Sequence, residues 1–307
     1  MPTIHIIFHA SDFDGQCAGA IAGQYMQETQ PAATMHWHPM NYGDQLDTSN
    51  LHEGDTVVIV DFSFHPDTMR DMHNRFHLIW IDHHKTAIDA ANVAGLDEIM
   101  GVREIGTAAC ELTWEYFYSV LELPSAVRLL GRYDVWDHNS TYNWDDCIYP
   151  FQMGMRQFAN TDPSTEEGRA FWKKALSYTL DECRDIIKDG NAIMRYEVVQ
   201  ATRAMKNAYE VDWNGLRALV VNRGGNSTTF ASRYDPDKHD LCVGFTRTEV
   251  RQYRLSIYSS KPNISAGSIA KLYGGGGHDG AAGCTVNTLP WEEQNETLSH
   301  PRDAASA

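Results

Sequence analysis

Three polar clusters in the first hundred residues contain the side chains that a metal-dependent hydrolase needs. They are His9-Ala-Ser-Asp12-Phe-Asp14-Gly15, Asp61-Phe-Ser63 and Asp82-His83-His84-Lys85. Crowded carboxylates repel one another and therefore need cations. Imidazole combined with carboxylate oxygen suits manganese, iron or zinc better than calcium. Two such ions about 3.5–4 Å apart, bridged by one carboxylate, can bind a phosphate and a hydroxide together, which is the chemistry of phosphoester hydrolysis.

Each cluster directly follows an apolar segment that predicts a buried strand, at residues 3–8, 56–61 and 76–81. Helices are predicted between and after them, at residues 16–27, from Pro66 and at 107–121. Continuous apolar strands that alternate with helices indicate a parallel, Rossmann-like α/β sheet covered on both faces. The carboxyl ends of such strands meet at one edge, where ligands bind. We therefore expect the three clusters to share one small volume.

A further polar candidate and two simpler explanations belong to the same hypothesis. The segment Arg132-Tyr133-Asp134-Val135-Trp136 follows a predicted helix and offers another carboxylate. A single histidine after a strand is more often a packing or capping residue, and Asp12 or Asp14 could cap the helix that follows. His36 and His38, two residues apart, fit an ordinary strand face. The coincidence of several His and Asp residues at strand ends favours the metal site.

The second half of the chain predicts a helical connector and a smaller α/β unit. Residues 163–210 have a helical composition, and strands are predicted at 216–221, 241–245, 253–258 and 283–286. The predicted divisions are a metal-binding catalytic domain at 1–160, a connector at 161–210, a substrate-binding domain at 211–290 and a flexible tail at 291–307. The fold class is therefore α/β, with an N-terminal parallel sheet and a second, smaller domain.

The charge of the chain is strongly uneven. The 307 residues carry a formal charge of −16. Residues 211–290 contain nine Lys or Arg and six acids, so that segment is +3 and the remainder is −19. A protein that binds long duplex DNA through its backbone is normally basic, so this partner is not expected. An acidic part that holds cations and a mildly basic part that holds phosphates fit a short substrate.

Cysteine usage and hydropathy indicate a cytoplasmic protein. None of the six cysteines forms a CxxC pair, so we expect neither a disulfide framework nor a zinc knuckle. The longest apolar runs, such as Val57-Val58-Ile59-Val60, are only strand-sized, far short of the roughly 18 residues of a membrane helix. The first residues lack a basic region followed by an apolar run, so no secretory signal and no membrane partner are expected.

Five motifs, taken together, resemble those of the DHH phosphoesterases. Ile81-Asp82-His83-His84-Lys85 is similar to the family signature, and the clusters at His9, Asp61 and Asp134 are similar to three further family motifs. Gly274–Gly283 resembles the glycine-rich motif of the DHH-associated C-terminal domain, as in nanoRNases and other oligoribonucleases. The resemblance extends from residue 4 to about 286, with the motifs in family order.

The resemblance implies a role for each motif residue. His9 and Asp12 would bind one divalent ion, Asp14, His83 and Asp134 the other, and Asp61 would bridge both. Asp82 would fix the tautomer of the His83 ring, as metal-bound imidazoles require, and His84 would contact the scissile phosphate. His278 and the backbone of Gly275, Gly276 and Gly277 would bind the far end of the nucleotide. Mn²⁺ is the expected cofactor, with Mg²⁺ and Co²⁺ as alternatives.

The sequence departs from the family pattern in the strand before the glycine motif. Many members have Ser-x-Arg there, whereas this chain has Ser256-Ile257-Tyr258. Arg254 or Arg251 could bind phosphate instead, or a base could stack on Tyr258. The glycine motif is not followed by Gly-Lys-Ser/Thr, so a P-loop is not predicted.

The leading functional hypothesis is hydrolysis of short single-stranded oligonucleotides, RNA or DNA, to mononucleotides. Alternatives of the same class are a linear or cyclic dinucleotide phosphodiesterase, a single-strand exonuclease, and a pyrophosphate or polyphosphate hydrolase. A nucleotide sensor without catalysis and a purely structural protein are alternatives of other classes. A homodimer is an open alternative for the assembly.

Overall fold

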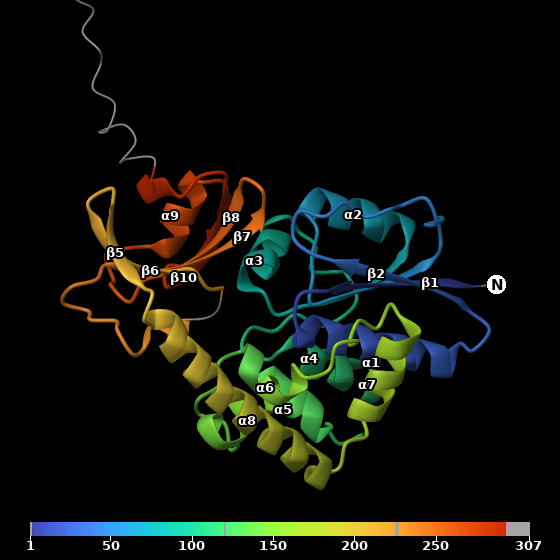
Figure 1. Cartoon of the computed structure of the whole chain (residues 1–307). Helices are drawn as coiled ribbons and strands as arrows, with labels where there is room; N and C mark the ends of the chain where they lie inside the picture. Colours follow the sequence, from blue (N-terminus) through green and yellow to red (C-terminus); the bar gives the residue numbers. More distant parts are fainter. Residues whose placement is uncertain (1, 120, 225–226, 293–307) are drawn as a thin grey trace, which may run out of the picture. The chain divides into compact units, whose positions relative to one another are not determined.

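The structure is a computed structural model that describes residues 2–119, 121–224 and 227–292. The chain divides into two compact units, Met1–Met194 and Arg195–Ala307 (Figure 1). The boundary lies inside helix α8 (Leu180–Met205), so the segment predicted as a separate connector is divided between both units. Most of the predicted tail falls on residues 293–307, which lie outside the described residues, whereas Trp291 is buried in the core of the second unit.

The first unit contains a four-stranded parallel sheet in the order β2-β1-β3-β4. Its strands are β1 (Thr3–His9), β2 (Thr34–Met40), β3 (Thr56–Val60) and β4 (His77–Ile81). Alternate residues of β1 face opposite sides: Ile6 belongs to one apolar cluster and Ile7 to another. Burial on both faces confirms the predicted parallel α/β sheet.

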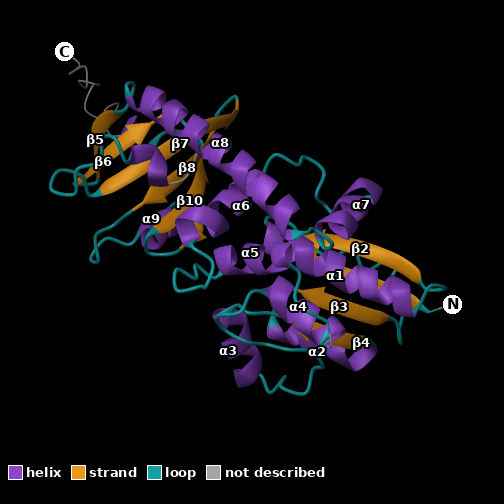
Figure 2. Ribbon diagram, turned by 90° about the horizontal axis from the view of Figure 1, so that it is seen from below, coloured by secondary structure: helices purple, strands orange, loops and turns teal. Residues whose placement is uncertain are grey.

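Helices cover both faces of this sheet (Figures 1 and 2). The helical segments of the first unit are α1 (Phe13–Thr29), α2 (Pro66–Arg75), α3 (Lys85–Val93), α4 (Ala109–Tyr118), α5 (Ser125–Asp134), a π-helical turn (Trp144–Ile148), α6 (Tyr149–Met155), α7 (Glu166–Ala175) and the first part of α8. Residues of α1, α4, α5 and α6 pack in the cluster that contains Ile6, and residues of α2 and α3 in the cluster that contains Ile7.

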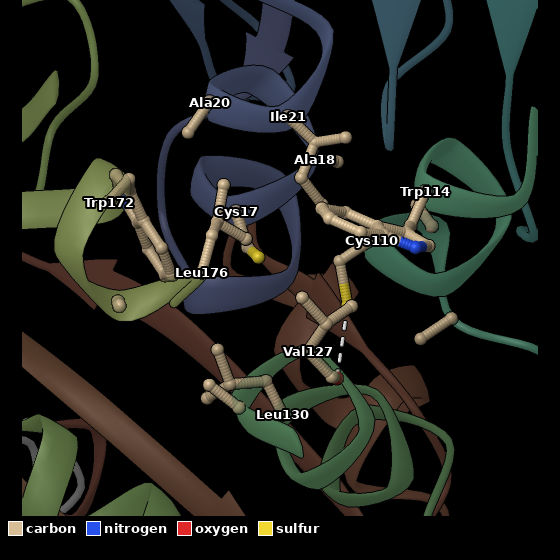
Figure 3. Packing of buried hydrophobic residues seen from close by; sticks show 14 of the residues in the cluster. Cys17, Ala18, Ala20, Ile21, Cys110, Trp114, Val127, Leu130, Trp172 and Leu176 are labelled. Carbon is tan, nitrogen blue, oxygen red and sulfur yellow. Dashed lines mark hydrogen bonds between the residues drawn. The ribbon is translucent and has the colours of Figure 1, made fainter. Parts of the chain in front are cut away.

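Small side chains allow the helices of the larger cluster to pack closely (Figure 3). Cys17 and Ala18 of α1 and Cys110 of α4 are fully buried there, and the Cys110 thiol lies 3.7 Å from the carbonyl oxygen of Val127. All six cysteines of the chain are unpaired thiols, and five of them are buried. The five buried cysteines therefore act as small apolar core residues.

The second unit is a six-stranded mixed sheet in the order β5-β6-β7-β8-β10-β9. Its elements are the end of α8, β5 (Tyr209–Trp213), β6 (Leu216–Val221), a 3₁₀ turn (Ser227–Phe230), β7 (Leu241–Glu249), β8 (Gln252–Tyr258), α9 (Ala266–Leu272), β9 (Gly276–Gly277) and β10 (Ala281–Val286). Leu255 and Ile257 of β8 pack in one core cluster with Ala266 and Ala270 of α9. Among the described residues, no helix has the length and apolarity to cross a bilayer.

Candidate metal centre

The end of β1 and the start of α1 contribute the first two polar side chains. His9 is the last residue of β1, and Asp12 is the N-cap of α1, accepting a hydrogen bond of 3.0 Å from the N–H of Gly15. The capping explanation therefore holds for Asp12, while its second oxygen, Oδ2, lies 2.9 Å from His9 Nδ1. A Cβ atom on Gly15 would lie 2.2 Å from the His9 carbonyl oxygen and 2.9 Å from Asp61 Oδ2, so only glycine fits there.

Asp61 follows β3 directly and has an unusual backbone. Its φ of +53° is in the left-handed region, and its N–H donates to the carbonyl oxygen of Ile81 at 3.0 Å. The residue is 1% exposed. A strained, buried carboxylate at the end of a central strand is typical of a functional position.

Asp82 lies between the end of β4 and the two histidines. Its Oδ1 accepts hydrogen bonds from the backbone N–H groups of His83 and His84, at 2.7 and 3.1 Å, and contacts Nδ1 of the His84 ring at 2.8 Å. The sequence predicts Asp82 beside the ring of His83. In the structure, the Asp82 carboxylate instead accepts hydrogen bonds from the backbone N–H groups of His83 and His84, and its contact with Nδ1 orients the ring of His84.

The carboxylate of Asp14, a residue in the first turn of α1, contacts the N-terminus of helix α4. Its two oxygens accept hydrogen bonds from the N–H groups of Ala109 and Cys110, at 2.9 and 2.8 Å, at the N-terminus of α4. The helix predicted from residue 107 begins at Ala109, with Ala108 in the N-cap position and no side-chain cap of its own, while the Thr107 hydroxyl donates to Glu104. The positive end of the helix favours the charged form of the buried Asp14 carboxylate.

The ring of His83 joins the separate contributions into one cluster. Its Nε2 lies 3.6 Å from Asp14 Oδ2, 3.2 Å from Asp61 Oδ1 and 3.4 Å from Oδ2 of Asp134, the last residue of α5. On the other side, Asp61 Oδ2 lies 3.5 Å from His9 Nδ1. The structure therefore brings together all six side chains that the sequence analysis selected as ligands.

The described residues form three overlapping groups that could hold a metal ion. The groups are His9 with Asp12 and Asp61, Asp14 with His83 and Asp134, and Asp61 with His83 and His84. Asp61 belongs to two of these groups and offers a different oxygen to each of His9 and His83.

Charges within the cluster are strongly coupled. Burial, followed by the charge of Asp61, raises the pKa of Asp134 to about 6, and burial with neighbouring carboxylates holds the pKa of Asp14 well above its usual range. Burial lowers the pKa of His9, but the carboxylates of Asp12 and Asp61 outweigh it and raise this pKa to about 10. The carboxylates thus compete for positive charge, which here comes from protons and imidazoles.

The donor set fits divalent cations. His9 Nδ1, Asp61 Oδ1 and Asp82 Oδ2 are buried and have no hydrogen-bond partner among the described residues. His9 Nδ1 is close to Asp12, but not in hydrogen-bonding geometry. Buried polar atoms without partners are costly, and a cation of the manganese type accepts both nitrogen and carboxylate oxygen. The first two of these atoms belong to the proposed ligand set.

Two features beside the cluster were missed by the sequence analysis. Tyr42 follows β2, and its ring centroid lies 5.8 Å from that of His9 and 6.2 Å from that of His84. A cavity of about 360 Å³ is lined by Asp12, Gln16, Gln152 and Arg156, among others. The position of Tyr42 after a strand could have indicated it, whereas nothing local marks Arg156.

The predicted substrate residues lie in the second unit, on or beside three neighbouring strands. Arg254 and Tyr258 are on β8, four residues apart and therefore on the same face of the strand, while Leu255 and Ile257 between them face the core. Gly276 and Gly277 form β9, which pairs with β10, and Gly275 precedes it. The exposed His278 follows, with its N–H donating to the carbonyl oxygen of Ala281 at 2.8 Å.

At the level of sequence, the chain is similar to known proteins only distantly. No protein-family model matches the chain. Protein R106 of Acanthamoeba polyphaga mimivirus is 22% identical over 253 residues, which are 78% of this chain and 56% of that protein, so the chain matches only about half of its relative's length.

Several solved structures align over nearly the whole chain. The pGpG-specific phosphodiesterase PggH of Vibrio cholerae has a TM-score of 0.51 at 14% identity, covering 97% of this chain and 96% of that one. The DHH domain of a member of a family of ribosomal proteins has a TM-score of 0.52 at 15% identity, covering 97% and 84%. RecJ of Thermus thermophilus, in complex with Mn²⁺, has a TM-score of 0.50 at 13% identity, covering 97% and 52%. The chain has a DHH-type fold.

Proposed function

We propose that this chain is a divalent-metal-dependent phosphodiesterase that hydrolyses short single-stranded oligonucleotides, down to dinucleotides, to mononucleotides. The observation that carries the proposal is the contact of His83 Nε2, within 3.6 Å, with carboxylates that follow β1 and β3 and end α5. The fold supports it, since one structural neighbour is a pGpG-specific phosphodiesterase and another was solved with Mn²⁺.

Two ion positions follow from the cluster. His9, Asp12 and Asp61 would hold one ion, and Asp14, His83, Asp134 and Asp61 the other. Asp61 would bridge them, because its Oδ2 faces His9 and its Oδ1 faces His83. The donor set favours Mn²⁺, with Mg²⁺ and Co²⁺ as alternatives.

The reaction would depend on how these residues orient a phosphate. When bound, the two cations would neutralise charge on the phosphorus oxygens and lower the pKa of an attacking water. The contact of Asp82 with Nδ1 raises the pKa of His84, and the protonated ring would donate a hydrogen bond to the scissile phosphate through Nε2. Arg156, in the cavity that also contains Asp12, would bind a neighbouring phosphate.

The second unit would bind the other end of the substrate. His278 is exposed, and β9 is the last strand in the sheet order, so the backbone of Gly276 and Gly277 is accessible from one side. Arg254 is exposed on β8, and the segment 211–290 is +3. These groups would interact with phosphate, with Tyr258 as the alternative contact.

The test is a product analysis. Labelled RNA and DNA of two to about twenty nucleotides, cyclic dinucleotides and pyrophosphate are incubated with the protein and Mn²⁺, with and without a chelator. We expect mononucleotides from the shortest linear substrates and no products after chelation. Asp61→Asn, prepared identically, controls for contaminating nucleases. Hydrolysis of pyrophosphate alone, or equal activity of the Asp61→Asn preparation, would contradict the proposal.

A further inference from the structure

Trp136 occupies a backbone position that normally belongs to glycine. Helix α5 ends at Asp134, and the N–H of Trp136 donates to the Tyr133 carbonyl at 3.1 Å while the N–H of Asp137 donates to the Arg132 carbonyl at 3.0 Å. These two bonds form a Schellman motif, whose left-handed residue is usually glycine. Here that residue is a tryptophan with a φ of +53°. A bulky side chain at such a position is strained, and strain of this kind concentrates at functional sites.

Hydrogen bonds of the Arg132 side chain hold the turn that contains Trp136. The guanidinium of Arg132 donates to both oxygens of the buried Glu111 of α4, at 2.6 and 3.2 Å, and to Asp137 at 3.1 Å. One arginine therefore ties the start and the end of the motif to a buried carboxylate. Charge-assisted hydrogen bonds of Arg132 therefore hold both ends of the turn.

The ring of Trp136 belongs to a cluster of nearly parallel aromatic rings, with its centroid 6.0 Å from that of His138 and 6.3 Å from that of Tyr133. Trp136 stacks with Trp144 at 5.3 Å and 19°, and Trp144 with Tyr133 at 5.6 Å and 11°. His138 stacks on Trp144 at 4.1 Å, and Tyr133 on Tyr149 at 6.2 Å. Despite these neighbours, Trp136 is 67% exposed. A largely exposed indole held among parallel rings offers a flat surface to another planar group.

The chain position of Trp136 is close to a residue of the metal centre. Asp134, whose carboxylate is 3.4 Å from His83 Nε2, is only two residues before Trp136. Two residues of chain span at most about 7 Å. A nucleotide whose phosphate lies at the metal centre could therefore reach this ring with its own base.

We propose that Trp136 is the stacking surface for the nucleobase next to the scissile phosphate, an assignment that rests on the proposed function. Stacking accepts every base, because each has a π-face, so the subsite selects nucleotides over pyrophosphate or other base-free phosphoesters without demanding a sequence. The strain of Trp136 is then explained as the cost of presenting a large ring at the C-terminus of α5. A single exposed tryptophan is common on protein surfaces. Trp136 differs because it combines a left-handed backbone, parallel ring neighbours and a position two residues after Asp134.

The test separates base recognition from catalysis. KM and kcat are measured for a dinucleotide and for the same phosphodiester with both bases replaced by hydrogen, using the wild type, Trp136→Gly and Trp136→Phe. For the dinucleotide, Trp136→Gly should raise KM about 5- to 150-fold, equivalent to about 1–3 kcal/mol. For the base-free substrate its KM should not change, and Trp136→Phe should retain most of the wild-type affinity. Tyr196→Ala, which removes another exposed aromatic ring, is the matched control and should behave as wild type.

A melting temperature accompanies the kinetics. Glycine relieves the left-handed backbone, so Trp136→Gly should melt at the same temperature as wild type or higher. A lower melting temperature together with an unchanged dinucleotide KM would show that the ring serves packing, and would overturn the proposal while hydrolysis by the wild type upholds the proposed function. If the wild type hydrolyses neither substrate, the proposed function is wrong. Equilibrium dialysis then tests Trp136 directly, by comparing the Kd of AMP with that of ribose 5-phosphate, which has no base. Equal binding of AMP by wild type and Trp136→Gly would refute the stacking role.

Discussion

The two regions with candidate functional residues differ in how far they bury them. These regions are the metal edge of the first unit and the glycine-rich end of the second. At the metal edge, the side chains of His9, Asp61 and His83 are 15%, 2% and 12% exposed, and polar atoms of His9 and Asp61 have no hydrogen-bond partner among the described residues. At the glycine-rich end, His278 is exposed and its backbone is already paired with Ala281. Buried polar atoms of the first region have no partner among the described residues, whereas His278 in the second region is exposed to water.

This difference reflects the cost of burial. Removing an ion from water costs several kcal/mol unless a partner compensates it, so a buried group of carboxylates indicates the cation that it requires. An exposed histidine or a glycine strand carries no such cost. Its geometry is therefore compatible with a binding role and equally with an ordinary turn. Mutations in the two regions should separate catalysis from binding.

The largest effect is expected for Asp61→Asn. Asparagine tolerates the left-handed backbone at this position, so the fold should persist, while both ion positions lose a charged ligand. We expect kcat to fall at least about a thousandfold, corresponding to the several kcal/mol that metal-assisted charge stabilisation contributes. Initial rates on a dinucleotide and metal content by mass spectrometry measure the effect.

Asp71→Asn is the matched control for this substitution. Asp71 is an exposed aspartate of α2 that pairs with Arg75 at 3.0 Å, so its replacement should leave kcat and metal content unchanged. Should Asp61→Asn retain both full metal content and wild-type kcat, the bridging assignment would be wrong, and the contrast between the two regions would lose its basis.

A smaller effect is expected for metal binding on stability, and it should depend on pH. The pKa of Asp134 is raised to about 6, above its ordinary value of 3.8, and that of Asp14 is also raised. A raised carboxyl pKa stabilises the metal-free fold fully below the ordinary value, and this stabilisation is lost as the pH rises through about 6. The crowded carboxylates therefore oppose folding most at neutral pH, where a cation can replace the missing protons.

Mn²⁺ at about 100 times its Kd should accordingly stabilise the protein by about 2.7 kcal/mol at pH 7.5, or about 5–10 °C in melting temperature. At the same Mn²⁺ concentration, the gain in stability at pH 5 should be clearly smaller, because protons compete with the ion for the same carboxylate oxygens. Scanning calorimetry with and without Mn²⁺ measures both values, and Asp61→Asn should show little gain at either pH. An equal gain at both pH values would exclude these carboxylates as the ligands.

The sequence predicted the metal edge better than the rest because its signals are local. Strand patterns ending in Asp and His residues place side chains at one sheet edge, whatever the surrounding loops do. Contacts that depend on the path of a loop were not predictable in this way. Tyr42 reaches the cluster from the loop after β2, and Asp14 accepts hydrogen bonds from the first N–H groups of α4.

The second unit shows the same limit for short elements. The strands at 216–221, 241–245 and 253–258 are long enough to show an apolar pattern, and all three were predicted. Strand β9 has two residues, Gly276 and Gly277, and exists only because β10 pairs with it. The left-handed backbone of Trp136 is equally invisible in the sequence, since that position usually selects glycine.

The smallest effect, and the one that tests the comparison most directly, is expected for His278→Ala. One lost hydrogen bond to a charged phosphate is worth about 1.5 kcal/mol, so KM for a dinucleotide should rise about tenfold while kcat stays unchanged. His77→Ala is the control, since His77 is an exposed histidine at the start of β4, at the other end of that strand from the metal cluster. A thousandfold fall in kcat at saturating substrate with KM unchanged would place His278 in the chemical step. The exposed end of the second unit would then be as essential to catalysis as the buried edge of the first, and burial would no longer distinguish their roles.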